Sequence, residues 1–178
     1  EKLYFTDGKG MFLTGEIITT DKKNTTVKII KKEKKRKNHN YSLHIAIAPT
    51  KNMDRFEWFL EKSTEIGIDE ITPIICSNSE RKIIKIERCN RILKSAMKQS
   101  LKFYLPKLNE PIMFKYFIQK KYEGQKYIAH CQEYKKIKLK KENIRMHIMI
   151  GPEGDFSEEE IRMATEKNFS HISLGNSR

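Results

Sequence analysis

The segment MIGPEGDFSEEEI, residues 149–161, decides the fold that this chain is expected to adopt. Its apolar run ends at Gly151-Pro152-Glu153-Gly154, and an acidic segment with helical character follows. Ser157 and Glu160 have the spacing of a capping box, which predicts that a helix begins there. A buried strand that turns directly into a helix is typical of α/β proteins with a parallel sheet.

The same alternation extends over residues 42–178. Short apolar runs predict strands at residues 43–49, 68–76, 126–131, 144–150 and 171–174. Amphipathic patterns predict helices at residues 54–67, 87–101 and 157–168, and residues 111–120 fit a further helix. The first helix should end at Gly67 and present one apolar face, formed by Phe56, Phe59, Leu60, Ser63 and Ile66. We therefore expect a parallel sheet with helices on both faces.

Residues 1–41 have a different pattern. Short β-prone runs alternate with turn signals at Asp7-Gly8, at Lys9-Gly10 and at residues 21–24, which predicts a small all-β unit. The Lys-rich segment KKEKKRKNHN, residues 31–40, reads either as a solvated turn or linker or as a basic patch. We place a domain boundary near residue 40, between units 1–41 and 42–178.

Composition narrows the classes of function. The formal net charge of +13 would attract polyanions, of which nucleic acid is the natural candidate, although a Lys-rich composition alone could reflect genome bias. No run approaches the roughly 18 apolar residues of a membrane helix. The cysteines are far apart and form no CxxC, which argues against a disulfide framework or zinc site and favours a reducing cytoplasm. The histidines are scattered and are expected to be packed or surface residues rather than metal ligands: His39, His44, His130, His147 and His171.

The loop at Gly151–Gly154 is the best candidate for a site, because open α/β sheets bind ligands beyond the carboxyl ends of their strands. Its glycines allow close backbone approach, and the carboxylates after it favour a cationic ligand over a phosphate. The segment SLGNSR, residues 173–178, would end beside this loop if the two preceding strands are neighbours. Both segments could also be ordinary turns without a ligand.

These loops resemble a known family signature. MIGPEGDFSEEEI followed by SLGNSR looks like the C-terminal signature of SPOUT-superfamily RNA methyltransferases, and more narrowly of the ribosomal RNA small subunit methyltransferase E family. Two upstream blocks, KNMDRFEWFLEKSTEIGIDEITPI and SNSERKIIKIERCNRILKSAMKQS, resemble the same family, as does FTDGKGMFLTGEI near the start. The resemblance covers nearly the whole chain, with its blocks in order.

The resemblance implies a SPOUT-type α/β methyltransferase domain with a trefoil knot, preceded by a small PUA-like β-barrel. It implies S-adenosylmethionine as the cofactor, methylation of N3 of a uridine in 16S ribosomal RNA, a homodimer and a cytoplasmic location, with no metal and no membrane. Phe156 and the helix after it would contribute to the dimer contact. The rival interpretations are a SPOUT enzyme that methylates a ribose 2′-hydroxyl and a non-catalytic RNA-binding module of ribosome assembly.

The family motifs assign roles to particular residues. The cofactor would be bound by Ile150, Gly151, Pro152, Glu153, Gly154, Leu174 and Gly175. Glu153, Arg81 and Arg178 are the candidate catalytic residues, although Glu153 could instead shape the loop and Arg81 could be a solvated surface residue. RNA would be bound by Lys62, Arg81, Arg88, Arg91, Gln99 and Lys102, although Lys62 could simply pair with Glu65.

The chain also departs from the family pattern. Asp155 stands where the family has a second glycine, Leu101-Lys102 replaces a Gly-Arg pair, and Ser177 separates Arg178 from its usual position. The family would continue beyond Arg178 with a segment that closes the knot, and it would begin earlier in the barrel. We therefore expect this sequence to lack both ends of the family's chain, and Asp155 raises the question of whether the cofactor pocket is complete.

Overall fold

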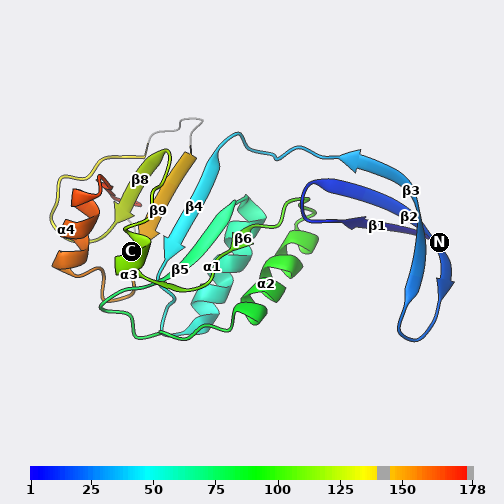
Figure 1. Ribbon diagram of the computed structural model, residues 1–178, viewed down its shortest axis with the longest axis horizontal. Coiled ribbons are helices and arrows are strands. Elements are labelled where there is room, and N and C mark those ends of the chain that lie inside the picture. Colours follow the sequence, from blue (N-terminus) through cyan, green and yellow to red (C-terminus); the bar gives the residue numbers. More distant parts are fainter. Residues whose placement is uncertain (140–144, 176–178) are drawn as a thin grey trace.

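The computed structural model describes residues 1–139 and 145–175, which form one small antiparallel sheet and one large parallel sheet (Figure 1). The small sheet contains β1 (Lys2–Thr6), β2 (Met11–Thr20) and β3 (Thr25–Lys34). The large sheet contains β4 (Ser42–Ile47), β5 (Glu70–Ile75), β6 (Lys107–Leu108), β7 (Ile112–Met113), β8 (Gln125–Ala129), β9 (Arg145–Ile150) and β10 (Ser170–Ile172). The helices are α1 (Met53–Ile66), α2 (Ile86–Gln99), α3 (Phe114–Phe117) and α4 (Glu158–Glu166).

Aspartate side chains shape the two turns of the small sheet. The Asp7 carboxylate accepts hydrogen bonds from the backbone N–H groups of Lys9 and Met11, and Asp21 accepts from Lys23 and Asn24. β3 continues to Lys34, so the first part of the Lys-rich segment is strand rather than turn or linker, because each residue from Lys31 to Lys34 pairs with β2.

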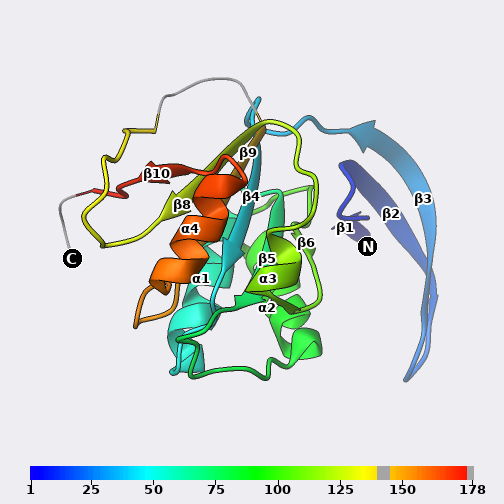
Figure 2. The ribbon, with the colours of Figure 1, turned by 60° about the vertical axis from the view of Figure 1, so that its left-hand side comes forward.

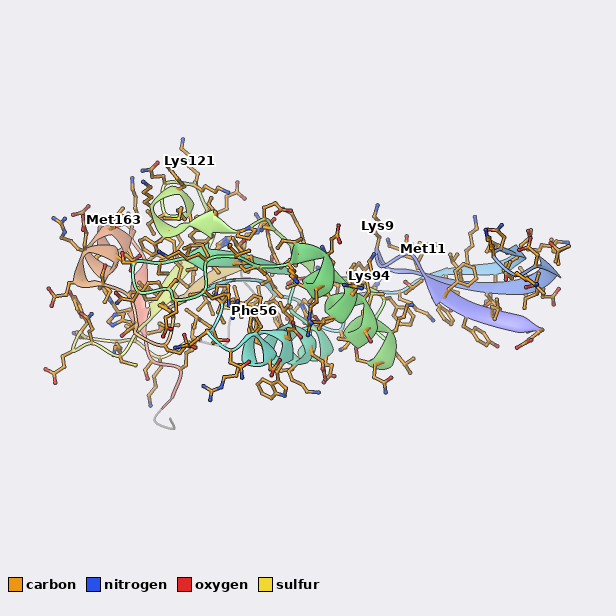
Figure 3. All side chains as sticks on the ribbon, turned by 90° about the horizontal axis from the view of Figure 1, so that it is seen from below. Lys9, Met11, Phe56, Lys94, Lys121 and Met163 are labelled. Atoms are coloured by element: carbon orange, nitrogen blue, oxygen red, sulfur yellow. The ribbon has the colours of Figure 1, made fainter. Side chains whose placement is uncertain are left out.

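The large sheet has the strand order β10-β8-β9-β4-β5-β6, with β7 pairing beside β5, and all of its pairs are parallel. In Figure 2, α3 and α4 lie in front of its strands, and α1 and α2 cover the opposite face. The edge-on view of Figure 3 shows Phe56 in the layer between the strands and α1. The predicted parallel sheet with helices on both faces is confirmed.

Two predictions about helices are wrong. Ile66 does not belong to the buried face of α1: its side chain is 76% exposed, because the buried residues follow the spacing Phe56, Leu60 and Thr64. Residues 111–120 do not form a full helix either. Ile112 and Met113 extend to pair with β5, so that only the four residues Phe114–Phe117 are helical. A short apolar run does not by itself distinguish strand from helix.

A chain of buried polar groups crosses the middle of the sheet. The Nε2–H group of His147 donates to the Glu123 carbonyl at 2.9 Å, which leaves its Nδ1 to accept from His44 Nδ1–H at 3.0 Å. His44 Nε2 in turn accepts from the Thr72 hydroxyl at 2.7 Å. Burial lowers the pKa of His44 to about 4 and also lowers the pKa of His147, so both rings are neutral at pH 7. The expectation of packed histidines is met for this pair.

The small sheet contacts the rest of the protein at a junction beyond α2, where residues 8–10 and Lys35 bond to residues 103–105 (Figure 1). The Gly10 N–H donates to the Phe103 carbonyl and the Leu105 N–H donates to the Gly8 carbonyl, both at 2.8 Å. The Tyr104 hydroxyl donates to the Lys35 carbonyl at 2.9 Å. Gly10 has a φ of 97°, and a Cβ atom there would lie 2.3 Å from the Tyr104 hydroxyl oxygen. Only glycine fits this contact.

None of the described helices has the length and apolar character needed to span a membrane.

Candidate active site

An open cleft of about 530 Å³ lies at the carboxyl ends of three neighbouring strands, β8, β9 and β10. Most of the residues predicted to bind a cofactor line it: Ile150, Gly151, Pro152, Glu153, Leu174 and Gly175. Gly154 is not one of the lining residues, and its carbonyl accepts a hydrogen bond from the Asn78 side chain at 3.1 Å. The structure thus brings the two loops together in one site.

The two loops meet across an intervening strand. β9 and β10 are not neighbours, because β8 lies between them. The carboxyl end of β8 therefore contributes Ala129, His130 and Cys131 to the cleft, and Lys136 joins them from the segment that follows. The sequence did not lead us to these residues. Ala129, His130 and Cys131 lie at the carboxyl end of the strand predicted at residues 126–131, and that position was the signal that could have found them.

Asp155 fits its position in an unexpected way. Its φ of 62° is in the left-handed region, which glycine tolerates best and which aspartate adopts more readily than most other residues. Its carboxylate then accepts from the N–H of Phe156 at 2.8 Å and from the N–H of Cys131 at 2.7 Å. The departure from glycine therefore adds a bond that ties the β8 loop to the β9 loop.

Glu153 and Arg81 contact the same residue of a third loop, which connects β4 to α1. A carboxylate oxygen of Glu153 accepts from the Lys51 N–H at 2.9 Å, and the Arg81 guanidinium donates to the Lys51 carbonyl at 2.7 Å. Glu153 is exposed at the rim of the cleft. The structure therefore gives Glu153 a loop-shaping contact and places Arg81 against the same residue.

A buried carboxylate connects the cleft to a fourth loop, after β5. Glu160 is 5% exposed and completes the predicted capping box, because it accepts from the Ser157 N–H at 3.0 Å while the Glu160 N–H donates to the Ser157 hydroxyl. Its other oxygen accepts from the Ser77 N–H at 2.8 Å. Phe156 is 1% exposed and packs near Phe114, so the expectation that Phe156 forms a dimer contact is wrong.

A second histidine pair lies beside the cleft. The Thr165 hydroxyl donates to the Ile161 carbonyl at 2.8 Å, so the Thr165 oxygen accepts from His171 Nε2–H at 3.0 Å. His171 Nδ1, 2.7 Å from His130 Nε2, must then be the acceptor of that bond. These bonds assign an unprotonated Nδ1 to a neutral His130, and this buried atom has no hydrogen-bond partner within the described residues.

The residues predicted to bind RNA are spread over α1 and α2 and the segment after α2. Lys62 pairs with Glu61 and with Glu65, as the alternative interpretation expected. Arg88 forms a two-pronged ion pair with Glu57 at 2.6 and 2.8 Å. Arg91 and Gln99 are exposed. Lys102 lines a small hollow near the junction, together with Arg36, Lys37 and Tyr104. Arg178 lies outside the described residues.

The described residues include no group of three or more histidine, cysteine or acidic side chains that could bind a metal ion. Cys76 and Cys89 are buried and Cys131 is exposed, and all three are free thiols.

Comparisons with known proteins agree with this geometry. Residues 35–178 match the model of the RNA methyltransferase domain family. The chain is 33% identical over 139 residues to the ribosomal RNA small subunit methyltransferase E of Mesomycoplasma hyopneumoniae, covering 75% of this chain and 60% of the relative. It is 34% identical over 158 residues to the ribosomal RNA small subunit methyltransferase E 2 of Borreliella burgdorferi, covering 83% of this chain and 62% of the relative. The chain thus spans about three fifths of the length of these curated relatives.

Solved structures give the same result. A probable rRNA-methyltransferase from Porphyromonas gingivalis superposes with a TM-score of 0.93 at 39% identity, covering 100% of this chain and 77% of the other. A putative methyltransferase from Legionella pneumophila, solved with bound SAM, superposes with a TM-score of 0.87 at 27% identity, covering 100% of this chain and 76% of the other. The family match, the parallel sheet and the cleft at its carboxyl edge together show that this chain belongs to the SPOUT RNA methyltransferases, in the ribosomal RNA small subunit methyltransferase E family.

Proposed function

We propose that this protein uses S-adenosylmethionine to methylate N3 of a uridine in 16S ribosomal RNA. The observation that carries the proposal is the cleft itself, where the family's GPEG and SLG loops meet at the carboxyl edge of a parallel sheet. The curated relatives are named for methylation of small-subunit ribosomal RNA, and the Legionella pneumophila relative binds SAM.

The residues of the cleft fit such a cofactor. Its volume of about 530 Å³ lies within the range of small-molecule sites, roughly 300–1,000 Å³. The carboxylates of Glu153 and Asp155 lie on the β9 side and suit a cationic sulfonium or ammonium group. Ile172 and Leu174 give the β10 side an apolar lining that suits a nucleoside. The buried Nδ1 of His130, which has no partner in the part of the chain that the structure describes, would offer one further acceptor.

The chain's own residues would position and polarise the substrate. When bound, S-adenosylmethionine supplies an electrophilic methyl group. Gly151, Pro152 and Gly175 would form the backbone walls around it, and Glu153 would keep the β9 loop fixed through its bond to Lys51. Arg81, whose guanidinium donates to the carbonyl of the same Lys51, would stabilise negative charge on the uracil oxygens as N3 loses its proton. Arg178 is proposed to assist from the segment after β10.

RNA would be bound by exposed cations on the α2 side and along the Lys-rich segment. Arg91, Lys94 and Lys98 are exposed on α2, and Lys102 lies beyond its end, near Arg36 and Lys37. Arg88 is proposed as a weaker contact than the others, because Glu57 already neutralises its guanidinium. Lys62 and Gln99 remain proposed contacts on the same side.

We also propose the architecture that the family implies. Residues 1–41 would belong to a PUA-like barrel and residues 42–178 to a SPOUT domain with a trefoil knot, acting as a homodimer in the cytoplasm. The antiparallel β1-β2-β3 sheet supports the first assignment. The insertion of β9 between β8 and β4, with β10 outside β8, supports the second.

Methyl transfer tests the proposal directly. Purified full-length protein and labelled S-adenosylmethionine are offered to small ribosomal subunits and to naked 16S rRNA, and the modified nucleoside is identified by mass spectrometry. We expect N3-methyluridine, and loss of it in an Arg81→Ala variant but not in an Arg162→Ala control on the exposed side of α4. Label on a ribose hydroxyl, or cofactor binding without transfer to any RNA, would contradict the proposal.

A further inference from the structure

His130 combines features that the proposed function does not yet use. The residue directly follows β8, lines the cleft and is only 7% exposed. Its ring packs edge-on against Tyr134 and His171, with ring centroids 5.2 and 5.0 Å away. Its Nε2 donates to His171, and its Nδ1 is buried without a partner within the described residues.

The surroundings fix the tautomer of this ring, so that Nδ1 is a hydrogen-bond acceptor in a residue that lines the cleft. The Thr165 hydroxyl is committed to the Ile161 carbonyl, which orients His171 and through it His130. Buried polar atoms in proteins are nearly always satisfied. A buried acceptor that has no partner among the described residues, in a side chain that lines a binding cleft, therefore points to a donor supplied by a ligand. A phosphate or carboxylate has no proton to donate there, so the expected partner is an N–H or O–H group.

We propose that His130 binds the nucleoside part of the cofactor, with Nδ1 accepting a hydrogen bond from an N–H or O–H group of the adenosine. His171 and Thr165 are positioning residues that keep Nδ1 unprotonated. The inference rests on the proposed function and adds a residue to its site. The nucleoside is favoured over the charged methionine part because His130 bonds to His171 of β10, the strand that brings Ile172 and Leu174 to the cleft, whereas Glu153 comes from the β9 loop.

The charges around His130 support an acceptor at neutral pH. Burial, Lys136 and His171 lower the pKa of His130, and Asp155 opposes them weakly. The other neighbours are the ring of Tyr134 and, behind His171, the uncharged Thr165 of α4. Protonation of Nδ1 would replace the acceptor with a donor, so binding should weaken as the pH falls through this pKa.

Calorimetric titration of the full-length protein with S-adenosylhomocysteine tests this at pH 8 and pH 5.5. His130→Phe keeps a buried ring but no acceptor, and we expect its affinity at pH 8 to fall about tenfold. We expect the variant to lose the pH dependence that the wild type shows. Thr165→Val should weaken binding less and shift that pH profile, whereas Tyr134→Phe, which keeps its ring beside His171, should bind like the wild type.

A second readout needs no variant. Nitrogen NMR of the wild-type histidines should show the Nε2–H tautomer of His130 and a shift of its Nδ1 resonance when S-adenosylhomocysteine is added. Unchanged affinity and pH profile in His130→Phe, or an Nδ1 resonance that does not move on binding, would overturn the role of His130 and leave the proposed function intact. If the wild-type protein does not bind S-adenosylhomocysteine, the proposed cofactor is wrong, and the role of His130 in binding it is wrong as well.

Discussion

Acidification should destabilise this protein through His44, well above the pH at which carboxylates protonate. In the folded protein burial lowers the pKa of His44 to about 4, whereas an unfolded imidazole titrates near its ordinary value of 6.5. Above pH 6.5 the ring is neutral in both states and has no effect on stability. Between pH 6.5 and 4 the unfolded state binds the proton and the folded state does not, so stability falls as the pH falls.

The size of the effect follows from the difference in pKa. Each unit corresponds to about 1.4 kcal/mol, so the full window lowers the free energy of unfolding by on the order of 3 kcal/mol. His147 should add to the loss, because burial lowers its pKa in the same direction. Both rings are at most 8% exposed, so solvent screens this effect little.

Urea unfolding at pH 8, 7, 6 and 5 measures this dependence. The matched comparison is His44→Gln, whose amide can still bond to neighbours but does not titrate. We expect the wild type to lose more stability than His44→Gln over this range, with the difference growing below pH 6.5. Parallel curves for the two proteins would refute the assignment of a neutral buried ring to His44.

Three further predictions concern the cleft, the junction and the RNA surface. In urea unfolding, Asp155→Gly should be more stable than Asp155→Ala by about 1 kcal/mol, because glycine adopts a φ of 62° without the steric strain that alanine has there. Equal stability of the two variants would count against left-handed strain at this position. Gly10→Ala should destabilise the protein by about 1–3 kcal/mol and make the junction sensitive to limited proteolysis, because the new Cβ would overlap Tyr104. Lys9→Ala, at an exposed position, should have neither effect. A protease-resistant junction in Gly10→Ala would disprove the contact. The third change replaces three exposed cations of α2 by glutamine: Arg91, Lys94 and Lys98. In filter binding, the slope of log affinity for 16S rRNA against log salt concentration should decrease in magnitude by about 2. An unchanged slope would show that RNA binds to another surface.

The parts of the fold that local sequence determines could be predicted. The glycine C-cap of α1 at Gly67 and the capping box of α4 at Ser157 both depend on neighbours within a few residues, and both are present as expected. The positions of Gly151 and Gly175 in the cleft could also be predicted, because strand ends and glycines are visible in the sequence.

Features that depend on distant partners could not be predicted. The order of the strands places β8 between β9 and β10, and no local pattern encodes that order. The tautomer that leaves His130 Nδ1 without a partner among the described residues is set by His171, 41 positions away. From the sequence, Asp155 is only a departure from the glycine of the family motif. Its bond to the Cys131 N–H forms only when β8 and β9 lie side by side, which the sequence does not reveal.

The hydrogen bonds that join the loops of the cleft have a consequence for how the protein is made. Glu153 bonds to a residue 102 positions earlier, Lys51, and Glu160 bonds to Ser77, 83 positions earlier. The loops after β4 and β5 are therefore synthesised long before the partners that shape them. Because these contacts close large loops of chain, forming them costs loop-closure entropy. During translation the cleft can assemble only after α4 has left the ribosome, so a nascent chain that stops short of that helix offers no cofactor site.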